Sequence, residues 1–118
     1  MELLAFDAAA GHRVDRFGSD FVLTPLMGPT DKARAVCLHV PPGGRVGEHD
    51  AVSGQLFAVV VGQGWVSGGD GVRVPIRPFE AAWWAPGERH AAGTEEGLVA
   101  FVIEGDFSVD GLRPTGGS

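Results

Sequence analysis

The sequence predicts an all-β protein, a single domain whose short antiparallel strands close into a jelly-roll barrel. Short apolar runs alternate with turn residues, and the 118 residues include 19 glycines and 8 prolines without a collagen-like period. Apolar residues nowhere recur at helical spacing over three turns. The length suits one domain, which we expect over residues 1–118, with the core in about 21–106 and a flexible C-terminal tail over 107–118.

The first third of the chain predicts strands with irregular edges. Residues 1–10 are apolar and fit either an edge strand or a loose helical turn. Residues 21–27 form a strand pattern that Pro25 interrupts, which is typical of a sheet edge or a bulge. Residues 33–40 form the next strand, which ends at the Pro-Pro-Gly-Gly sequence of 41–44.

The rest of the chain predicts a series of hairpins. Residues 56–61 are an unbroken run of Leu, Phe, Ala and Val, too short for a helix and typical of a strand buried on both faces. Gly-Gln-Gly at 62–64 and the glycine-rich turn at 67–71 predict two successive hairpins. Residues 80–84 and 98–103 supply the remaining strands, for about eight in all.

Composition excludes several classes of partner. Nine basic and fifteen acidic residues give a net charge of −6, and Lys32 is the only lysine. Without a basic stripe, we expect no nucleic-acid partner. No apolar stretch is long enough to cross a bilayer and no leader-like segment opens the sequence, so we expect no membrane partner and a cytoplasmic location. The single cysteine, Cys37, lies in an apolar run and is expected to be buried.

Two distant histidines follow similar turns. His49 stands six residues after Gly43 of a Pro-Gly pair, and His90 stands three residues after Gly87 of another. Gln55 lies six residues beyond His49, and Gly62 follows at the next turn. This spacing predicts that two imidazoles from distant strands converge in one barrel.

These segments resemble the two motifs of the cupin superfamily, and the resemblance covers roughly residues 33–105. The first family motif has a His-x-His pair and a glutamate; here Ala51 stands at the second histidine position and Gln55 at the glutamate position. The second motif, Pro-x-Gly-x-x-His, keeps Gly87 and His90, with Ala85 at the proline position. The resemblance implies a small single-domain cupin, a jelly-roll barrel with a degenerate metal-binding motif.

In metal-binding members of that family, the motif histidines and the glutamate hold a divalent ion. The resemblance therefore implies a weakened site made of His49, Gln55 and His90, with Glu88 as a weak carboxylate supplement, for zinc, nickel, iron or manganese. Gln55 brings no charge to offset that of the ion. The alternative is that the two histidines form a hydrogen-bonded polar pair that holds no ion, and both interpretations remain open.

Strand alternation extends the site into a ligand pocket. If Gln55 faces the interior, Phe57 and Val59 face it too, so His49, Gln55, Phe57, Val59 and His90 line a mostly apolar pocket. We expect the chain to bind a small molecule there. The alternative is a metal-dependent enzyme of dioxygenase or isomerase type acting on a small polar metabolite, and a third interpretation is a structural or regulatory role with a vestigial pocket. The sequence assigns no catalytic residue.

A homodimer is the expected self-association. The resemblance implies pairing through a sheet face or an exchanged N-terminal strand, and the apolar segment at 3–6 is the candidate for that exchange.

Overall fold

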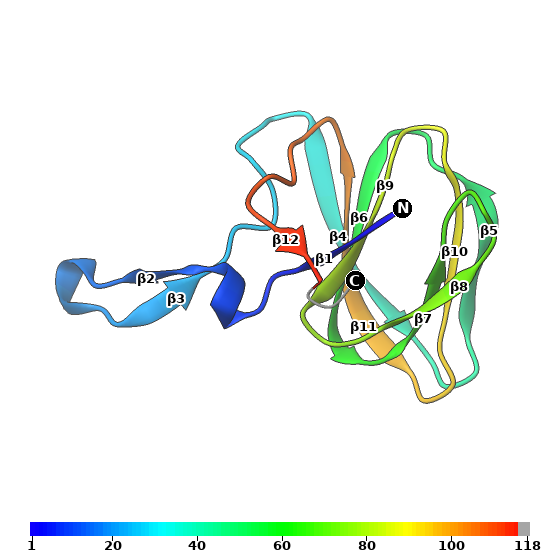
Figure 1. The fold of residues 1–118 in the computed structure, drawn as a ribbon, viewed down its shortest axis with the longest axis horizontal. Coiled ribbons are helices and arrows are strands. Elements are labelled where there is room, and N and C mark those ends of the chain that lie inside the picture. Colours follow the sequence, from blue (N-terminus) through cyan, green and yellow to red (C-terminus); the bar gives the residue numbers. More distant parts are fainter. Residues whose placement is uncertain (116–118) are drawn as a thin grey trace.

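The computed structural model describes residues 1–115 as two sheets packed face to face, with an arm that projects from them (Figure 1). The strands are β1 (Glu2–Ala5), β2 (His12–Val14), β3 (Phe21–Leu23), β4 (Ala33–Val40), β5 (Arg45–Asp50), β6 (Gly54–Gly62), β7 (Gly64–Ser67), β8 (Arg73–Ile76), β9 (Glu80–Trp84), β10 (Arg89–Gly93), β11 (Leu98–Gly105) and β12 (Arg113–Pro114). Single 3-10 turns lie at Ala8–Ala10 and Arg16–Gly18.

The strand order is that of a jelly roll. The larger sheet has six strands in the order β12-β1-β9-β6-β11-β4, and the smaller has four in the order β5-β10-β7-β8. The chain crosses between these two sheets after β4, β5, β6, β8, β9 and β10, and every pairing is antiparallel. The predicted all-β jelly roll is therefore confirmed.

The turn at 62–64 is where the hairpin prediction is wrong. It carries the chain from β6 in one sheet to β7 in the other. Gly62 has φ +79°, and a β carbon there would collide with the carbonyl oxygen of Gly97, so the crossing requires glycine. The second predicted hairpin is confirmed, since β7 pairs with β8 from Gly64 opposite Ile76 to Ser67 opposite Arg73.

The six-stranded sheet is apolar on both faces. Its inner face packs against the smaller sheet through Phe57, Val59 and Trp84, while its outer face buries Leu56 and Ile103. The adjacent tryptophans obey strand alternation. Trp84 lies in the inner core and is 1% exposed, whereas Trp83 lies outside with its ring 5.3 Å from that of Phe107 at 77°.

Both ends of the described chain join the six-stranded sheet, through β1 and β12. Residues 107–115 do not form a loose tail, because Phe107 and Leu112 pack on the outer face and β12 pairs with β1; residues 116–118 lie outside the described part. The segment at 3–6 overlaps β1, which pairs with β9 of its own barrel, and its exchange between copies stays a prediction.

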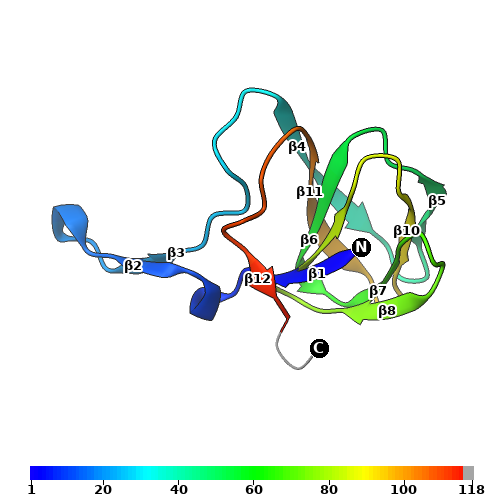
Figure 2. The ribbon, with the colours of Figure 1, turned by 45° about the horizontal axis from the view of Figure 1, so that its top comes forward.

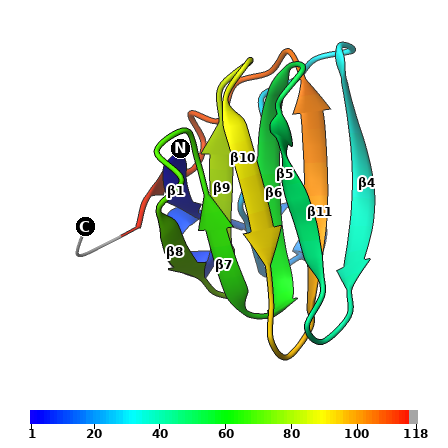
Figure 3. The ribbon, with the colours of Figure 1, turned by 90° about the vertical axis from the view of Figure 1, so that its right-hand side faces the viewer.

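Two parts of the chain lie uncovered. The arm, residues 12–23, pairs only β2 with β3 and stands clear of the barrel (Figures 1 and 2). Strand β4 ends the six-stranded sheet, and β5 ends the four-stranded sheet on the same side of the barrel (Figure 3). Cys37 on β4 is exposed, which shows the predicted burial to be wrong. No helix within residues 1–115 is long and apolar enough to span a membrane.

Candidate functional site

The two motif histidines are direct partners across a strand pair. His49 on β5 lies opposite His90 on β10, and their ring centroids are 4.3 Å apart with a 58° angle between the planes. The prediction that the two turns bring these imidazoles together is therefore confirmed. His90 is 2% exposed, whereas His49, on the edge strand, is exposed.

A bulge in β5 aims the exposed histidine at the interior. His49 pairs with His90, but Val46, three residues earlier, pairs with Ala92, only two residues along β10. The extra residue on β5 reverses the alternation of that strand. Val46 and His49 therefore both face the cavity, as do His90 and Ala92 opposite them.

Each imidazole is anchored in the same way. The Nδ1 atom of His49 lies 2.7 Å from the carbonyl oxygen of Gly47, and that of His90 lies 3.1 Å from the carbonyl oxygen of Glu88. A carbonyl oxygen only accepts, so each Nδ1 donates its hydrogen, and each neutral ring keeps its lone pair on Nε2. Nε2 is thus the ring nitrogen through which each histidine can contact a group in the cavity that both residues line.

His90 is held in its neutral form. Its ring stacks on Trp84, with centroids 4.3 Å apart and 27° between the planes. Burial lowers the pKa of His90 below the ordinary value of 6.5, and the neighbouring His49 lowers it further, against the opposing hydrogen bond to Glu88. At neutral pH the ring therefore accepts a hydrogen bond, or donates a lone pair to a metal ion, through Nε2.

The histidines close a small cavity of about 70 Å³. Its polar lining is His49, Gln55 and His90, and its apolar lining is Leu38, Val46, Phe57, Trp84, Ala92 and Val102. A cavity this size admits a few water molecules or a group of a few heavy atoms, whereas drug-sized ligands need about 300–1,000 Å³. A larger molecule would have to protrude between β4 and β5.

Two expected site residues are placed elsewhere. Val59 is fully buried in the core and does not line the cavity. The Glu88 carboxylate accepts hydrogen bonds from the backbone of Gly69 and Ala85 and forms an ion pair with the Met1 amine at 2.7 Å. Burial would raise the pKa of Glu88, but these hydrogen bonds outweigh it and lower the pKa. The carboxylate thus stabilises the turn before His90.

A polar row that the motif comparison missed continues from Gln55 to the open edge. Glu104 lies directly opposite Gln55, and Arg34 lies opposite Glu104 on β4. Strand alternation puts this row on the inner face, with Val102. Arg34 donates to Glu104 from Nε at 2.7 Å. The row can be recognised only from the strand register, which places Glu104 opposite Gln55. The sequence alone does not give that register.

The donor set fits a weakly held divalent ion only. Two Nε2 atoms and the Gln55 amide oxygen give three neutral ligands, whereas structural zinc sites have four protein ligands. Among residues 1–115, no three His, Cys, Asp or Glu side chains are grouped closely enough to hold a metal. Water or a ligand would have to complete the coordination shell, so metal binding stays a prediction.

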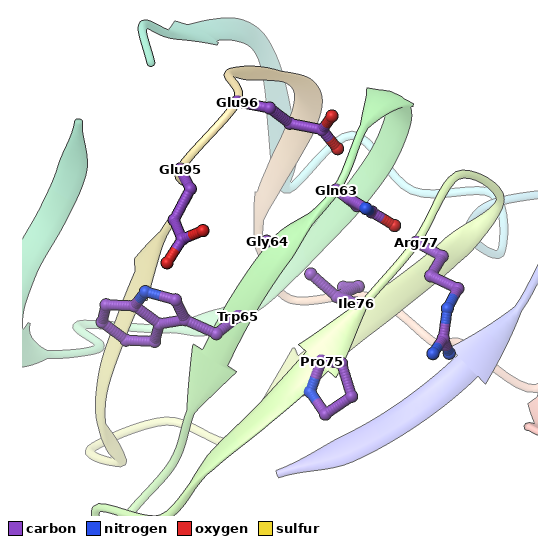
Figure 4. Close-up of a pocket in the computed structure, with 8 residues that line it drawn as sticks. All are labelled: Gln63, Gly64, Trp65, Pro75, Ile76, Arg77, Glu95 and Glu96. Carbon is purple, nitrogen blue, oxygen red and sulfur yellow. The ribbon is translucent and has the colours of Figure 1, made fainter. Parts of the chain in front are cut away.

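A larger surface pocket of about 440 Å³ lies away from the histidines, lined in part by Trp65, Arg77 and Glu95 (Figure 4). The Trp65 ring is already covered, since Arg73 lies 3.7 Å above its centroid and Gly93 lies so near the indole that a β carbon would not fit. The charged side chains around it are exposed. This pocket offers neither a free aromatic face nor a buried polar group.

One protein of known activity is similar to this chain in sequence. The chain is 32% identical over 81 residues to (R)-mandelonitrile lyase from Granulicella tundricola, a match that spans 67% of this chain and 62% of that protein. No protein-family model matches.

Solved structures share the fold at lower identity. A cupin superfamily protein from Desulfitobacterium hafniense matches with a TM-score of 0.59 at 14% identity, covering 70% of this chain and 75% of that one. A protein with a double-stranded β-helix domain from Klebsiella pneumoniae matches with a TM-score of 0.58 at 22% identity, covering 73% and 78%. At these identities the likeness shows the fold.

Proposed function

We propose that this chain, which shares its fold with a cupin superfamily protein and a double-stranded β-helix protein, is itself a cupin whose barrel binds a small polar molecule at His49, Gln55 and His90. The observation that carries the proposal is the matched pair of imidazoles, each with Nδ1 fixed to a carbonyl oxygen two residues earlier and Nε2 left for a ligand. Anchoring one ring nitrogen in this way is how proteins orient histidines that bind through the other.

The cavity sets the chemical class of the ligand. Neutral Nε2 atoms accept hydrogen bonds, so a hydroxyl group suits them, and the Gln55 amide can both donate and accept. The apolar lining favours a group without net charge. A divalent ion that binds here would be held by the same three residues, with solvent or ligand completing its shell, and would polarise a bound oxygen.

Nitrogen-15 NMR of the histidine side chains tests this proposal. The probes are glycolonitrile, which has a hydroxyl group and few heavy atoms, and zinc chloride. We expect the Nε2 resonances of His49 and His90 to move with at least one probe. His12, which is exposed on the arm, is the internal control and should not move.

Two variants separate the site from adventitious binding. His90→Ala should abolish the response of His49 to the probe that moves it, and the matched His12→Ala should leave the response unchanged. If neither probe moves His49 and His90, or if His90→Ala leaves the response of His49 intact, the proposed binding site is wrong.

A second candidate is a lyase that acts on a 2-hydroxynitrile, and the similarity to (R)-mandelonitrile lyase favours it. An imidazole Nε2 would take the hydroxyl proton, the carbon–carbon bond to the nitrile would break, and cyanide would leave with the electron pair. Release of benzaldehyde from mandelonitrile, followed by ultraviolet absorbance, tests it. Activity that survives both His49→Ala and His90→Ala would count against this candidate, and dioxygenase or isomerase activity stays a prediction.

A further inference from the structure

We propose that Glu104 and Arg34 form a second polar subsite beside the cavity, and that the ligand of the barrel is an uncharged vicinal diol. One hydroxyl of the diol binds at the pair of imidazoles, and the other binds at Gln55 and the Glu104 carboxylate. This inference rests on the proposed function, since it names the chemical class of the molecule held at that same site.

The strand register places Glu104 beside the cavity. On β11 it lies directly opposite Gln55 and two residues after Val102, on the same face, and both of these neighbours line the cavity. Residues directly opposite each other on antiparallel strands have Cα atoms about 4.5–5.5 Å apart. A ligand group that extends past Gln55 toward the free edge at β4 therefore meets Glu104 next (Figure 3).

Arg34 binds Glu104 through only one of the two carboxylate oxygens. Its Nε atom lies 2.7 Å from Oε1, and its Nη2 atom lies 2.6 Å from the same oxygen. Arginine–carboxylate pairs are frequently bidentate, with one N–H on each oxygen. Here the second oxygen, Oε2, forms no hydrogen bond or ion pair with any of residues 1–115. Since both oxygens of a carboxylate accept, Oε2 is left for a donor from outside the chain.

The Gln55 side chain is also without a partner in the described part of the chain. Its amide forms no hydrogen bond within residues 1–115, although it lines the cavity and its strand is paired on both sides. An amide has two donor hydrogens and an acceptor oxygen. Covering such a group without a hydrogen bond is costly, so a ligand that fills the cavity has to bring a polar group to Gln55.

The groups left for a ligand are mostly hydrogen-bond acceptors. The two neutral imidazoles accept through Nε2, Glu104 accepts through Oε2, and only the Gln55 amide also donates. A hydroxyl group donates and accepts, whereas the oxygen of a ketone or an ether only accepts and finds a single donor group here. Two hydroxyls on adjacent carbons therefore match this set better than one hydroxyl or a carbonyl.

Charge disfavours ionic ligands at this site. Arg34 already balances Glu104, so an ammonium group would lack a counter-ion, and a ligand carboxylate would meet the Glu104 carboxylate. A charge moved from water into a mostly apolar cavity is costly without a partner. An uncharged diol of three carbons meets these conditions, and its few heavy atoms suit a cavity of about 70 Å³.

Arg34 acts in this subsite as a positioning residue. Its side chain is 74% exposed and that of Glu104 is 33% exposed, so the guanidinium lies at the rim and holds the carboxylate from the solvent side. Inward-pointing charges on an edge strand also protect a free sheet edge from pairing with other chains. A residue with that role alone would not alter the choice of ligand, and this difference separates the two roles by experiment.

Nitrogen-15 NMR titrations with 1-propanol and 1,2-propanediol test the proposal on the full chain, because the two probes differ by one hydroxyl. We expect the Nε2 resonance of His90 to report binding of the diol about 20-fold tighter than that of 1-propanol, as for a hydrogen bond to a charged group. Glu104→Gln removes the charge at nearly the same size and should reduce this preference to about threefold, as for a neutral hydrogen bond.

Arg34→Gln tests whether Arg34 acts through Glu104. It should reduce the preference for the diol in the unaltered protein and change it no further in the Glu104→Gln background. Asp20→Asn is the matched control, because it breaks the exposed ion pair of 2.8 Å between Arg13 and Asp20 on the arm and should leave the preference unchanged. Circular dichroism should show that all variants keep the barrel, since exposed ion pairs contribute little to stability.

The outcomes distinguish the subsite from the proposed function. If the two alcohols bind equally well, or if Glu104→Gln leaves the preference unchanged, the subsite is wrong while binding at His49 and His90 stands. If neither alcohol moves the histidine resonances but glycolonitrile or zinc does, the ligand class is wrong and the proposed function stands. If no probe moves them, both proposals are wrong. Equal losses from Arg34→Gln with and without Glu104 would overturn the positioning role.

Discussion

The two sides of this barrel differ in whether further strands cover the sheet edges. On one side β9 is covered by β1, which is in turn covered by β12, and Ala81, Ala82 and Leu4 are buried. On the other side β4 and β5 end their sheets, and Val36 and His49 are exposed. We call these the covered side and the open side. The covered side has the packing that gives stability, and the open side has the ligand-accessible groups, which are drawn from less tightly packed regions.

The largest loss of unfolding free energy is expected at Trp84, which lies between the inner core and the candidate site. Trp84→Ala removes a ring that is 1% exposed, its stacking on His90 and its hydrogen bond to the carbonyl oxygen of Ser67. Large-to-small changes of this kind cost about 3–5 kcal/mol of unfolding free energy. Urea denaturation measures it, and Trp83→Ala on the outer face should cost less than Trp84→Ala. Equal losses would contradict the assignment of Trp84 to the inner core.

The same substitution on the two sides tests the comparison directly. Leu4 on the covered side is 4% exposed, whereas Leu38 on the open side is only partly buried. We expect Leu4→Ala to lower the unfolding free energy by about 3 kcal/mol and Leu38→Ala by about half as much. Both values come from denaturant titrations at one pH. A greater loss for Leu38→Ala would contradict the looser packing of the open side.

The pH dependence of stability reports on His90. Because burial holds the pKa of His90 in the folded state below its unfolded value of about 6.5, the unfolded chain binds the proton first as the pH falls. The contribution of His90 to stability is therefore fully present above pH 6.5, declines as the pH drops through that value and levels off below the folded pKa. Thermal midpoints at pH 8 and pH 5 should differ by less in His90→Gln than in the unaltered protein. An unchanged difference would contradict this account.

The smallest effect is expected from the charged groups on the open side. Arg89 pairs with Glu48 at 2.8 Å and with Asp50 at 3.4 Å across the β5–β10 ladder, and all three side chains are well exposed. Exposed pairs of this kind contribute little. We expect Arg89→Gln to leave the thermal midpoint unchanged within error and the probe response of His49 intact. A clear loss of either would show that these pairs help to position β5.

Most of the fold could be predicted from the local pattern of the sequence. The strands at 33–40, 80–84 and 98–103 lie where alternation and turn residues placed them. The turn at 62–64 could not be assigned in this way, because the same glycines that close a hairpin also allow a chain to cross between sheets. The last segment was misjudged because Phe107 and Leu112 are apolar residues among turn formers, and only the outer face of the sheet shows what they cover.

The candidate site, too, could be predicted from the sequence only in part. The spacing of the two motifs predicted that His49 and His90 meet, and their register confirms it. The sequence did not show the β5 bulge, which turns His49 inward by breaking the alternation on which sequence reasoning depends. Sequence reasoning also assigned Val59 to the pocket, because strand alternation cannot show which inward residues reach the cavity. It assigned Glu88 to a metal site, because the sequence does not show that this carboxylate is already hydrogen-bonded.

The sequence by itself determined the class of fold and the pair of histidines, because strand period, turn residues and motif spacing are local properties of the chain. The tertiary structure decided the size of the cavity, the neutral state of His90, the polar row of Arg34 and Glu104 and the uncovered edge of β4. These depend on which strands become neighbours and which remain at an edge. Burial and pairing between distant segments are properties of the assembled barrel, and no single stretch of sequence contains them.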